Sequence, residues 1–309
     1  MKDFVFARFL FTVRLDADFP DPYILYGIRS AFMQAFRTRI CRDKVPCDMC
    51  GKKREECAYY MTFSQSLADD QSAVKRHQKP PLPFAFDFPF LPALPNKGHQ
   101  IEIGLTLAGS ALNYVAEYIA AMEALFSVDR IGRGLPGTII RVESLGCFDD
   151  RTCLMQEGGV VALDNVTTIS GRDLIEMKPL DAERIKLTIS TPMRIIHDGL
   201  PVREFSCSIF LRSLLRRISS LTYYYYKSGH DIDYKRLATT CTDIQLENNA
   251  FRWSAWRQCQ GAGHLSGILG SGYCVGRLDE ELRIFLLLGE YFHTGKGAAF
   301  GLGSFRIET

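Results

Sequence analysis

The first forty residues change from one hydrophobic pattern to another. Residues 4–15 are rich in aromatic and β-branched side chains, a composition that predicts a strand. Pro20 and Pro22 follow, and apolar side chains then recur at every fourth position, which predicts an amphipathic helix. These helical positions are Ile24, Ile28, Phe32 and Phe36. The chain therefore begins with a strand followed by a helix.

The remainder of the first half continues this series of elements. Residues 81–90 and 100–107 predict two strands, and a helical stripe of apolar residues follows. That stripe consists of Leu112, Val115, Ile119, Met122 and Leu125. A glycine-rich turn at 132–137 then leads into a β-rich run at 138–142. The order is strand, helix, two strands, helix and strand.

The second half repeats this order. The expected elements are a strand at 184–189, a helix at 205–224, strands at 243–253 and 263–275, a helix at 278–292 and a strand at 304–308. Two β-α-β-β-α-β cycles predict an α+β protein with tandem ferredoxin-like domains. We place the first domain at residues 1–150 and the second at 183–309. Between them, 151–182 is the expected linker, with a hairpin around Gly158-Gly159.

Composition narrows the class of protein. The chain has 309 residues, of which 47% are hydrophobic and 23% charged, which excludes disordered and fibrous proteins. A net charge of +2 means that any basic face is local. The N-terminus lacks the order of a signal peptide, and no uncharged apolar run reaches the length of a membrane span. We therefore expect a cytoplasmic protein.

Four of the ten cysteines form a cluster within an insertion at residues 41–60. Cys41, Cys47, Cys50 and Cys57 have the spacing C-x5-C-x2-C-x6-C, which suits a tetrahedral zinc site. With all four positions taken by the protein, such a zinc is structural. An iron-sulfur cluster or thiols without a metal are the alternatives.

Glycines dominate the segment before the last predicted strand. Gly295, Gly297, Gly301 and Gly303 allow the backbone to approach an anionic ligand closely, although a tight turn explains them equally well. A nucleotide P-loop is excluded. Five residues rather than four separate Gly289 from Gly295, and the segment follows a helix instead of preceding one.

The glycine-rich segment 295–303 resembles the C-terminal signature of RAMP proteins, in particular the CRISPR repeat endoribonucleases. Further similar segments are 191–194, 210–221 and 253–258, together with 103–109 and 132–137 in the first half. The cysteine-rich insertion after the first helix resembles one branch of the family. This resemblance implies a protein that binds CRISPR repeat RNA and cuts it without a metal, leaving a 2′,3′-cyclic phosphate and a 5′-hydroxyl. Other CRISPR effector subunits are candidate partners.

For RNA binding, the resemblance implies that the glycine-rich segment lies against the phosphate backbone with Lys296 as a donor. Arginines suit phosphate binding, and neighbouring aromatic rings suit base stacking. Trp253 and Trp256 fit a hydrophobic core better than base stacking. The predicted RNA-binding residues are Gly295, Lys296, Gly297, Gly301, Gly303, Arg212, Arg216, Arg217, Arg252 and Arg257.

Metal-independent cleavage needs a base, an acid and positive charge on the phosphate. We hypothesise that His293 is the acid or base and that Lys296 stabilises the phosphate. A histidine at a helix C-terminus that interacts with the helix dipole is the alternative for His293. Many relatives carry a catalytic histidine on or just after the first helix, where this chain has none, and Arg29 and Arg37 are the reserve candidates.

The missing first-helix histidine also favours a second function, that of a non-catalytic RAMP subunit holding guide RNA in an effector complex. A zinc or iron-sulfur protein unrelated to RNA is a third possibility, which depends on the cysteine cluster alone.

Overall fold

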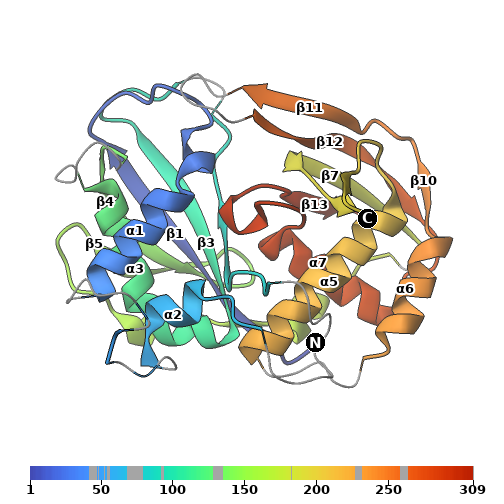
Figure 1. Ribbon diagram of the computed structural model, residues 1–309, viewed down its shortest axis with the longest axis horizontal. Coiled ribbons are helices and arrows are strands. Elements are labelled where there is room, and N and C mark those ends of the chain that lie inside the picture. Colours follow the sequence, from blue (N-terminus) through green and yellow to red (C-terminus); the bar gives the residue numbers. More distant parts are fainter. Residues whose placement is uncertain are drawn as a thin grey trace.

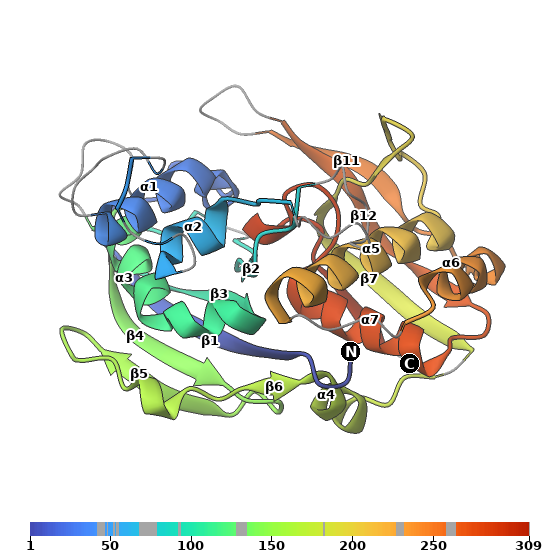
Figure 2. The same cartoon turned by 60° about the horizontal axis from the view of Figure 1, so that its bottom comes forward.

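The computed structural model describes most of the chain as two domains, each built from one sheet with helices on one face (Figures 1 and 2). The described residues are 1–41, 47, 49–51, 53, 56–67, 79–91, 94–127, 135–181, 183–226, 232–257 and 264–308. Within these ranges, no helix combines the length and apolarity needed to cross a bilayer.

The first sheet has all its neighbouring strands antiparallel. In spatial order its strands are β2 (Phe84–Asp87), β3 (Gln100–Ala108), β1 (Val5–Leu15), β4 (Gly137–Leu145) and β5 (Arg151–Gln156). Its helices are α1 (Arg29–Ile40), α2 (Ala58–Phe63) and α3 (Val115–Phe126), with short 3-10 turns at Ile24–Gly27 and Gly109–Tyr114. β1 lies between β3 and β4, which is the ferredoxin-like order.

The second sheet repeats this order. Its strands run β10 (Gln245–Glu247), β12 (His264–Val275), β7 (Arg184–Met193) and β13 (Phe305–Glu308), and β11 (Arg252–Arg257) also pairs with β12. Its helices are α5 (Cys207–Tyr226), α6 (Tyr234–Asp243) and α7 (Glu280–Phe292). A two-stranded hairpin of β8 (Ile196–His197) and β9 (Leu200–Pro201) follows β7. The predicted tandem ferredoxin-like fold is confirmed.

Two segments differ from the sequence-based prediction. A continuous strand at 243–253 is wrong, because α6 ends at Asp243 and the chain then forms two separate short strands. Asn248 between them has a left-handed backbone with φ of 48°, which interrupts the ladder. The expected linker carries regular structure: β5 extends the first sheet, β6 (Ile169–Ser170) pairs with the start of β1, and α4 (Gly171–Met177) lies against α7 (Figure 2).

The two hydrophobic cores exchange side chains across the domain boundary. Phe300, which follows α7 in sequence, packs edge-on against Phe84 of β2 at a ring distance of 5.4 Å and belongs to the core of the first domain. Conversely, Phe4 and Phe6 from the start of the chain pack against Phe292 in the core of the second domain. These shared contacts fix the two domains relative to each other, and so position the groups at the boundary.

A buried ion pair joins α4 to α7. Lys178 Nζ lies 2.8 and 2.9 Å from the two carboxylate oxygens of Glu290, whose side chain is 5% exposed and also accepts from the Ile307 amide. We expect Lys178→Met to lower the free energy of unfolding by about 2 kcal/mol, because it leaves a buried carboxylate without its cation.

The matched control is Lys186→Met, which removes an exposed pair with Glu308 and should cost at most about 0.5 kcal/mol. Urea unfolding of both variants measures the difference. Equal losses would contradict a special role for the buried pair.

Candidate functional site

The glycine-rich loop, residues 295–303, is fixed by its own backbone and by β7. The Thr294 amide donates to Gly303 O at 3.2 Å, and the Lys296 amide donates to Arg194 O at 2.8 Å. Thr191 Oγ1 donates to Gly301 O at 2.9 Å. Gly295, Gly297, Gly301 and Gly303 all have φ between 68° and 92°, so glycine suits each position. The loop is therefore an ordered turn between α7 and β13, as the tight-turn interpretation requires.

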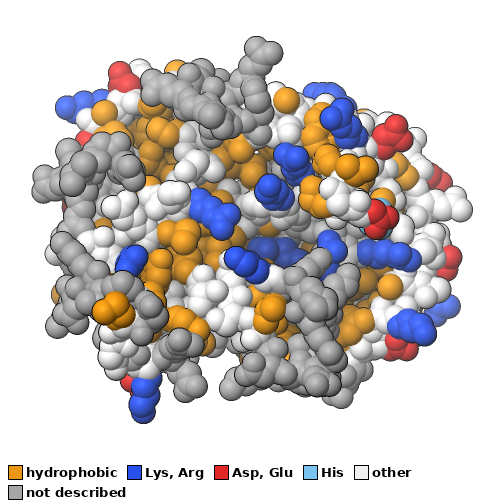
Figure 3. Space-filling model, in the orientation of Figure 1, with side chains coloured by type: hydrophobic (Ala, Val, Ile, Leu, Met, Phe, Trp, Pro, Cys, Tyr) orange, Lys and Arg blue, Asp and Glu red, His pale blue; other side chains and the backbone are white. Residues whose placement is uncertain are grey.

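Beside this loop lies an interdomain cleft of ≈ 930 Å³. It is lined by the loop, by α5, by the β8–β9 hairpin, by Arg29 of α1 and by residues 79–82 ahead of β2. Figure 3 shows Lys and Arg side chains gathered on this face between the domains. The basic lining residues are Arg29, Lys79, Arg194, Arg216, Arg217 and Lys296, whereas Asp198 is the one carboxylate among the described residues that line the cleft. The cleft is therefore suited to a polyanion.

Two arginines that line this cleft each have a donor atom without a partner. Arg217 Nε donates to Phe292 O at 2.9 Å, but its Nη2 is buried without a hydrogen-bond partner. The Nε of Arg194 is likewise buried and unpartnered. Burial lowers the pKa of Arg217 to about 10, so the guanidinium is still a cation at neutral pH. Ser213 Oγ and Thr294 Oγ1 are joined by a 3.1 Å hydrogen bond in the same lining.

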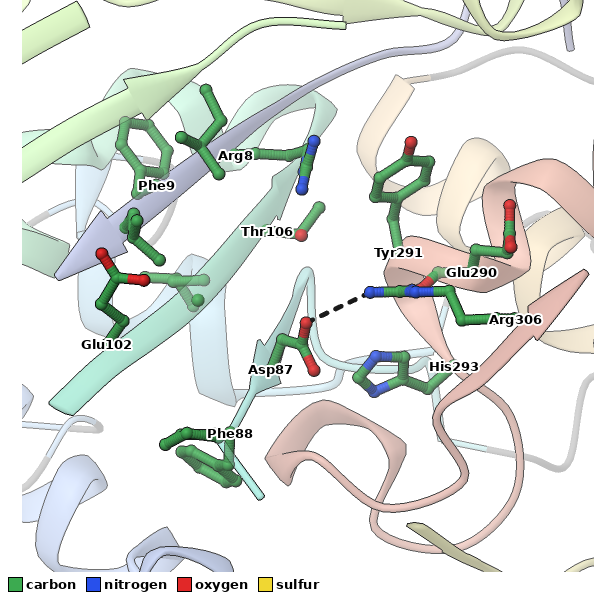
Figure 4. A pocket seen from close by; sticks show the side chains of 15 residues that line it. Arg8, Phe9, Asp87, Phe88, Glu102, Thr106, Glu290, Tyr291, His293 and Arg306 are labelled. Carbon is green, nitrogen blue, oxygen red and sulfur yellow. Dashed lines mark hydrogen bonds and ion pairs between the residues drawn. The ribbon is translucent and has the colours of Figure 1, made fainter. Parts of the chain in front are cut away.

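His293 faces a different space. Its side chain is 1% exposed and lines a small pocket of ≈ 250 Å³, together with Asp87 and Arg306, which form a 3.4 Å ion pair (Figure 4). A left-handed backbone at His293, with φ of 58°, turns the chain at the end of α7. Burial lowers the pKa of His293 to about 4, and its Nδ1 has no hydrogen-bond partner. The structure thus does not bring His293 into the cleft with Lys296.

This buried histidine predicts a pH-dependent stability. In the unfolded chain its pKa returns to about 6.5, so the unfolded state binds more protons than the folded state between about pH 4 and 6.5. The stabilisation is therefore complete above pH 6.5 and decreases as the pH falls through that window. We expect His293→Asn, which keeps a residue tolerant of left-handed φ, to flatten this decrease.

The measurement is urea unfolding at several pH values between 4 and 7. The same pH dependence in His293→Asn as in the wild type would show that other groups cause it.

Two family models match successive parts of the chain. The AF_1859_N model, an N-terminal domain, matches residues 4–166, and a model described as CRISPR-associated endoribonuclease Cas6 matches residues 187–305. The second half of the chain is therefore a Cas6 domain.

Individual proteins are similar to this chain over nearly its whole length. An uncharacterised protein of Archaeoglobus fulgidus is 23% identical over 292 residues, which are 93% of this chain and 92% of that protein. A Cas6 (TTHA0078) product complex has a TM-score of 0.56 at 16% identity and covers 99% of this chain and 100% of its own. A product complex of Thermus thermophilus Cas6 (TTHB231) has a TM-score of 0.59 at 14% identity, with 98% and 100% covered. These likenesses show a shared fold.

Several of the predicted RNA-binding residues, most of them in the Cas6 domain, meet at the cleft. Gly295, Lys296, Gly297, Arg216 and Arg217 line it, as does the reserve candidate Arg29. Gly301 and Gly303 belong to the same loop. The remaining arginines lie elsewhere. Arg212 donates to Ala238 O of α6, Arg252 is exposed on β11, and Arg37 lies over the ring of Tyr59 at 6.0 Å. The side chain of Arg257 lies outside the described residues.

The two tryptophans have different environments. Trp253 packs against the core of the second domain, as expected. Trp256 instead stacks on Tyr23 of the first domain, with ring centroids 4.7 Å apart and planes 18° apart. It therefore contributes to the domain boundary rather than to a core.

The four clustered cysteines flank the end of α1 and the start of α2. Burial raises the pKa of the Cys41 thiol, and Cys57 and Cys47 raise it further. Among the residues that the structure describes, no group of three or more His, Cys, Asp or Glu side chains is arranged to hold a metal ion. The zinc site stays a prediction.

Sequence reasoning missed several residues of the cleft, among them Lys79, Arg194 and His197. His197 stands at the tip of the β8–β9 hairpin, where Asp198 and Gly199 both have positive φ. The Asp-Gly pair after His197 was the available signal for this hairpin turn. Nothing in the sequence indicated that the hairpin would lie beside the glycine-rich loop.

Proposed function

We propose that this protein binds CRISPR repeat RNA in precursor transcripts and cuts it without a metal ion, giving guide RNA with a 2′,3′-cyclic phosphate end and a fragment with a 5′-hydroxyl. The observation that carries the proposal is the basic interdomain cleft, whose described lining includes six cationic side chains and the glycine-rich loop but only one carboxylate. An RNA backbone supplies the compensating charge. The Cas6 family match over residues 187–305 supports the same substrate.

In the proposed reaction, the 2′-hydroxyl attacks the adjacent phosphorus while the bond to the 5′-oxygen breaks. A base takes the proton of the 2′-hydroxyl, and an acid gives a proton to the leaving 5′-oxygen. Lys296 and Arg29 approach the cleft from opposite domains and are exposed, so both can reach a bound phosphate. We assign them to stabilisation of the negative charge that grows in the transition state. Arg37 is a candidate for contact with flanking RNA.

Two histidines are candidates for proton transfer. His197 lines the cleft, while His293, the residue expected from the sequence, lines the small pocket. Lys296 and Arg29, which we assign to phosphate stabilisation, line the same cleft as His197. We therefore expect His197→Asn to slow cleavage by about a hundredfold. His293→Asn should leave the cleavage rate near that of the wild type above pH 6.5. Single-turnover cleavage of repeat RNA measures both. The reverse result would assign the chemistry to His293 and to the small pocket.

A guide-holding subunit without cleavage is the second candidate function. Helix α1, where many relatives carry the catalytic histidine, is fully described and contains none. His293, the candidate from the sequence, is buried. Both observations favour a subunit that does not cut RNA. This subunit would bind repeat RNA through the same cleft and would retain it for other CRISPR effector subunits.

The deciding experiment is incubation of the purified protein with CRISPR repeat RNA in excess EDTA, with the product ends resolved by gel and by mass. We expect one cut and a cyclic phosphate. Tight binding without a cut would select the guide-holding subunit, and the absence of binding would contradict both functions. Circular dichroism in the same buffer verifies that EDTA leaves the fold intact.

We further propose that Cys41, Cys47, Cys50 and Cys57 hold a structural zinc with no part in cleavage. The C-x5-C-x2-C-x6-C spacing supports it, as does the tetrahedral preference of zinc for thiolates. Elemental analysis of the wild type and of Cys47→Ser tests it. Absence of zinc from the wild type would exclude the site, and iron in its place would select a cluster.

A further inference from the structure

The wall of the interdomain cleft carries a positive charge that no described residue of the chain pairs with. Arg217 is half-buried, with its Nε bound to Phe292 O and its buried Nη2 without a partner. Asp198, the one carboxylate among the described cleft residues, lies on the exposed hairpin. A guanidinium with a buried, unpartnered donor and no counter-ion is unfavourable, since the loss of hydration at that donor is not repaid by a hydrogen bond or an opposite charge. Its presence indicates that a ligand brings the anion.

A second arginine approaches from a different element. Arg194 follows the end of β7, and its carbonyl accepts from the amide of Lys296 at 2.8 Å. A Cβ added to Gly295 would lie 2.8 Å from that carbonyl oxygen, so the loop packs directly on Arg194. The Nε of Arg194 is buried and unpartnered like the Nη2 of Arg217. Arg217 on α5 and Arg194 after β7 thus line one cleft, and each has a guanidinium donor without a partner.

Two hydroxyl groups lie in the same lining. Ser213 of α5 and Thr294 are 6% and 0% exposed, and they bond to each other at 3.1 Å. Each hydroxyl can act as donor or acceptor, so one of the pair can turn its proton to an incoming oxygen. Guanidinium donors together with hydroxyls form the usual environment of a tetrahedral oxyanion in proteins.

We propose that Arg194, Arg217, Ser213 and Thr294 form a binding site for one phosphate group, the phosphate site. Resting on the proposed function, we assign its occupant as a single phosphodiester of the repeat RNA, held deeper than the phosphates contacted by exposed Lys296 and Arg29. A fixed phosphate sets the register of the RNA along the cleft. The site therefore helps to determine which linkage meets the catalytic groups.

A purely structural role for Arg217 is the competing explanation, because its Nε satisfies a carbonyl at the C-terminal end of α7. That role accounts for the Nε of Arg217 and leaves its buried Nη2 without a partner. It also does not involve Arg194, which comes from another element.

The first test uses inorganic phosphate as the probe and does not depend on cleavage. Phosphate should raise the melting temperature of the wild type above the value in chloride of equal ionic strength, and Arg217→Gln and Arg194→Gln should lose this rise. Arg277→Gln, at an arginine whose side chain is 90% exposed, is the matched control. Arg217→Lys, which keeps the charge, should retain part of the rise. Equal stabilisation of all variants would overturn the site.

The second test identifies the source of the phosphate. Repeat RNAs with one neutral methylphosphonate linkage each are titrated against the wild type and against Arg194→Gln. One position should weaken wild-type binding by roughly tenfold to a hundredfold and should have no further effect in the variant. A phosphate-induced rise without any such position would overturn the RNA assignment and leave a site for free phosphate. If one methylphosphonate position weakens binding only when Arg194 is present, but no RNA is cut, the phosphate site is supported and the proposed nuclease activity is contradicted.

Discussion

Replacement of Lys296 by alanine should slow cleavage of repeat RNA by about 10²–10³-fold, the loss found when one donor to a transition-state oxyanion is removed. Lys296 is exposed at the edge of the cleft, and it forms no ion pair with any described residue. Its charge is therefore available to the RNA. The amide of Lys296 keeps its bond to Arg194 O in the variant, so the loop should stay in place.

Single-turnover rates at saturating RNA separate this effect from weaker binding. Lys235→Ala is the matched control, because Lys235 is an exposed lysine on α6, outside the cleft lining. The free energy of unfolding should change by less than about 0.5 kcal/mol in both variants. A Lys296→Ala enzyme that binds more weakly but cuts at the wild-type rate would assign Lys296 to RNA binding alone.

Gly303→Ala should lower the free energy of unfolding by roughly 3–5 kcal/mol and abolish RNA binding. Gly303 has φ of 68°, and a Cβ at this position would lie 1.8 Å from Thr294 O. Alanine therefore adds a collision with backbone to the strain of a left-handed conformation. Because Thr294 begins the turn that carries Lys296, the shift required to accommodate alanine would displace the cleft-lining residues as well.

Gly158→Ala is a control of the same backbone geometry. Gly158 has φ of 71° with nothing within 4 Å of an added Cβ, so its variant isolates the conformational strain, about 1 kcal/mol. Chemical unfolding of both variants gives the excess caused by the collision. Equal losses would mean that the loop adjusts without cost and that its packing on β7 is looser than the structure indicates.

The cleft shows how a protein with a net charge of +2 can bind a polyanion. Many carboxylates are paired on other surfaces, as in Arg236 with Glu281 and Lys186 with Glu308, whereas the cleft collects cations from both domains. Local concentration of charge, rather than the overall balance, produces the attractive field. We expect the affinity for RNA to fall steeply with salt for the same reason.

The spacing of hydrophobic residues along the sequence was sufficient to predict most of the helices and strands. Strand β1, helix α7 and the turn after it follow directly from local patterns, because a strand or helix with one buried face needs apolar residues at a fixed spacing. The repeated order of elements then determined the tandem fold, since each ferredoxin-like unit places its first strand between the third and the fourth. Helix α6 escaped prediction because only two of its residues, Leu237 and Cys241, are buried.

Only the tertiary structure determined which residues line the cleft. Arg29 and Lys296 are far apart in the sequence and meet only because the domains exchange core side chains such as Phe300. His293 is two residues from Gly295, yet a left-handed backbone at the end of α7 directs its side chain into another pocket. The sequence by itself thus determined which elements form and which loop carries the glycines. Only the packing of two domains determined which charges share one cavity, because side-chain direction and long-range contact leave no periodic trace in the chain.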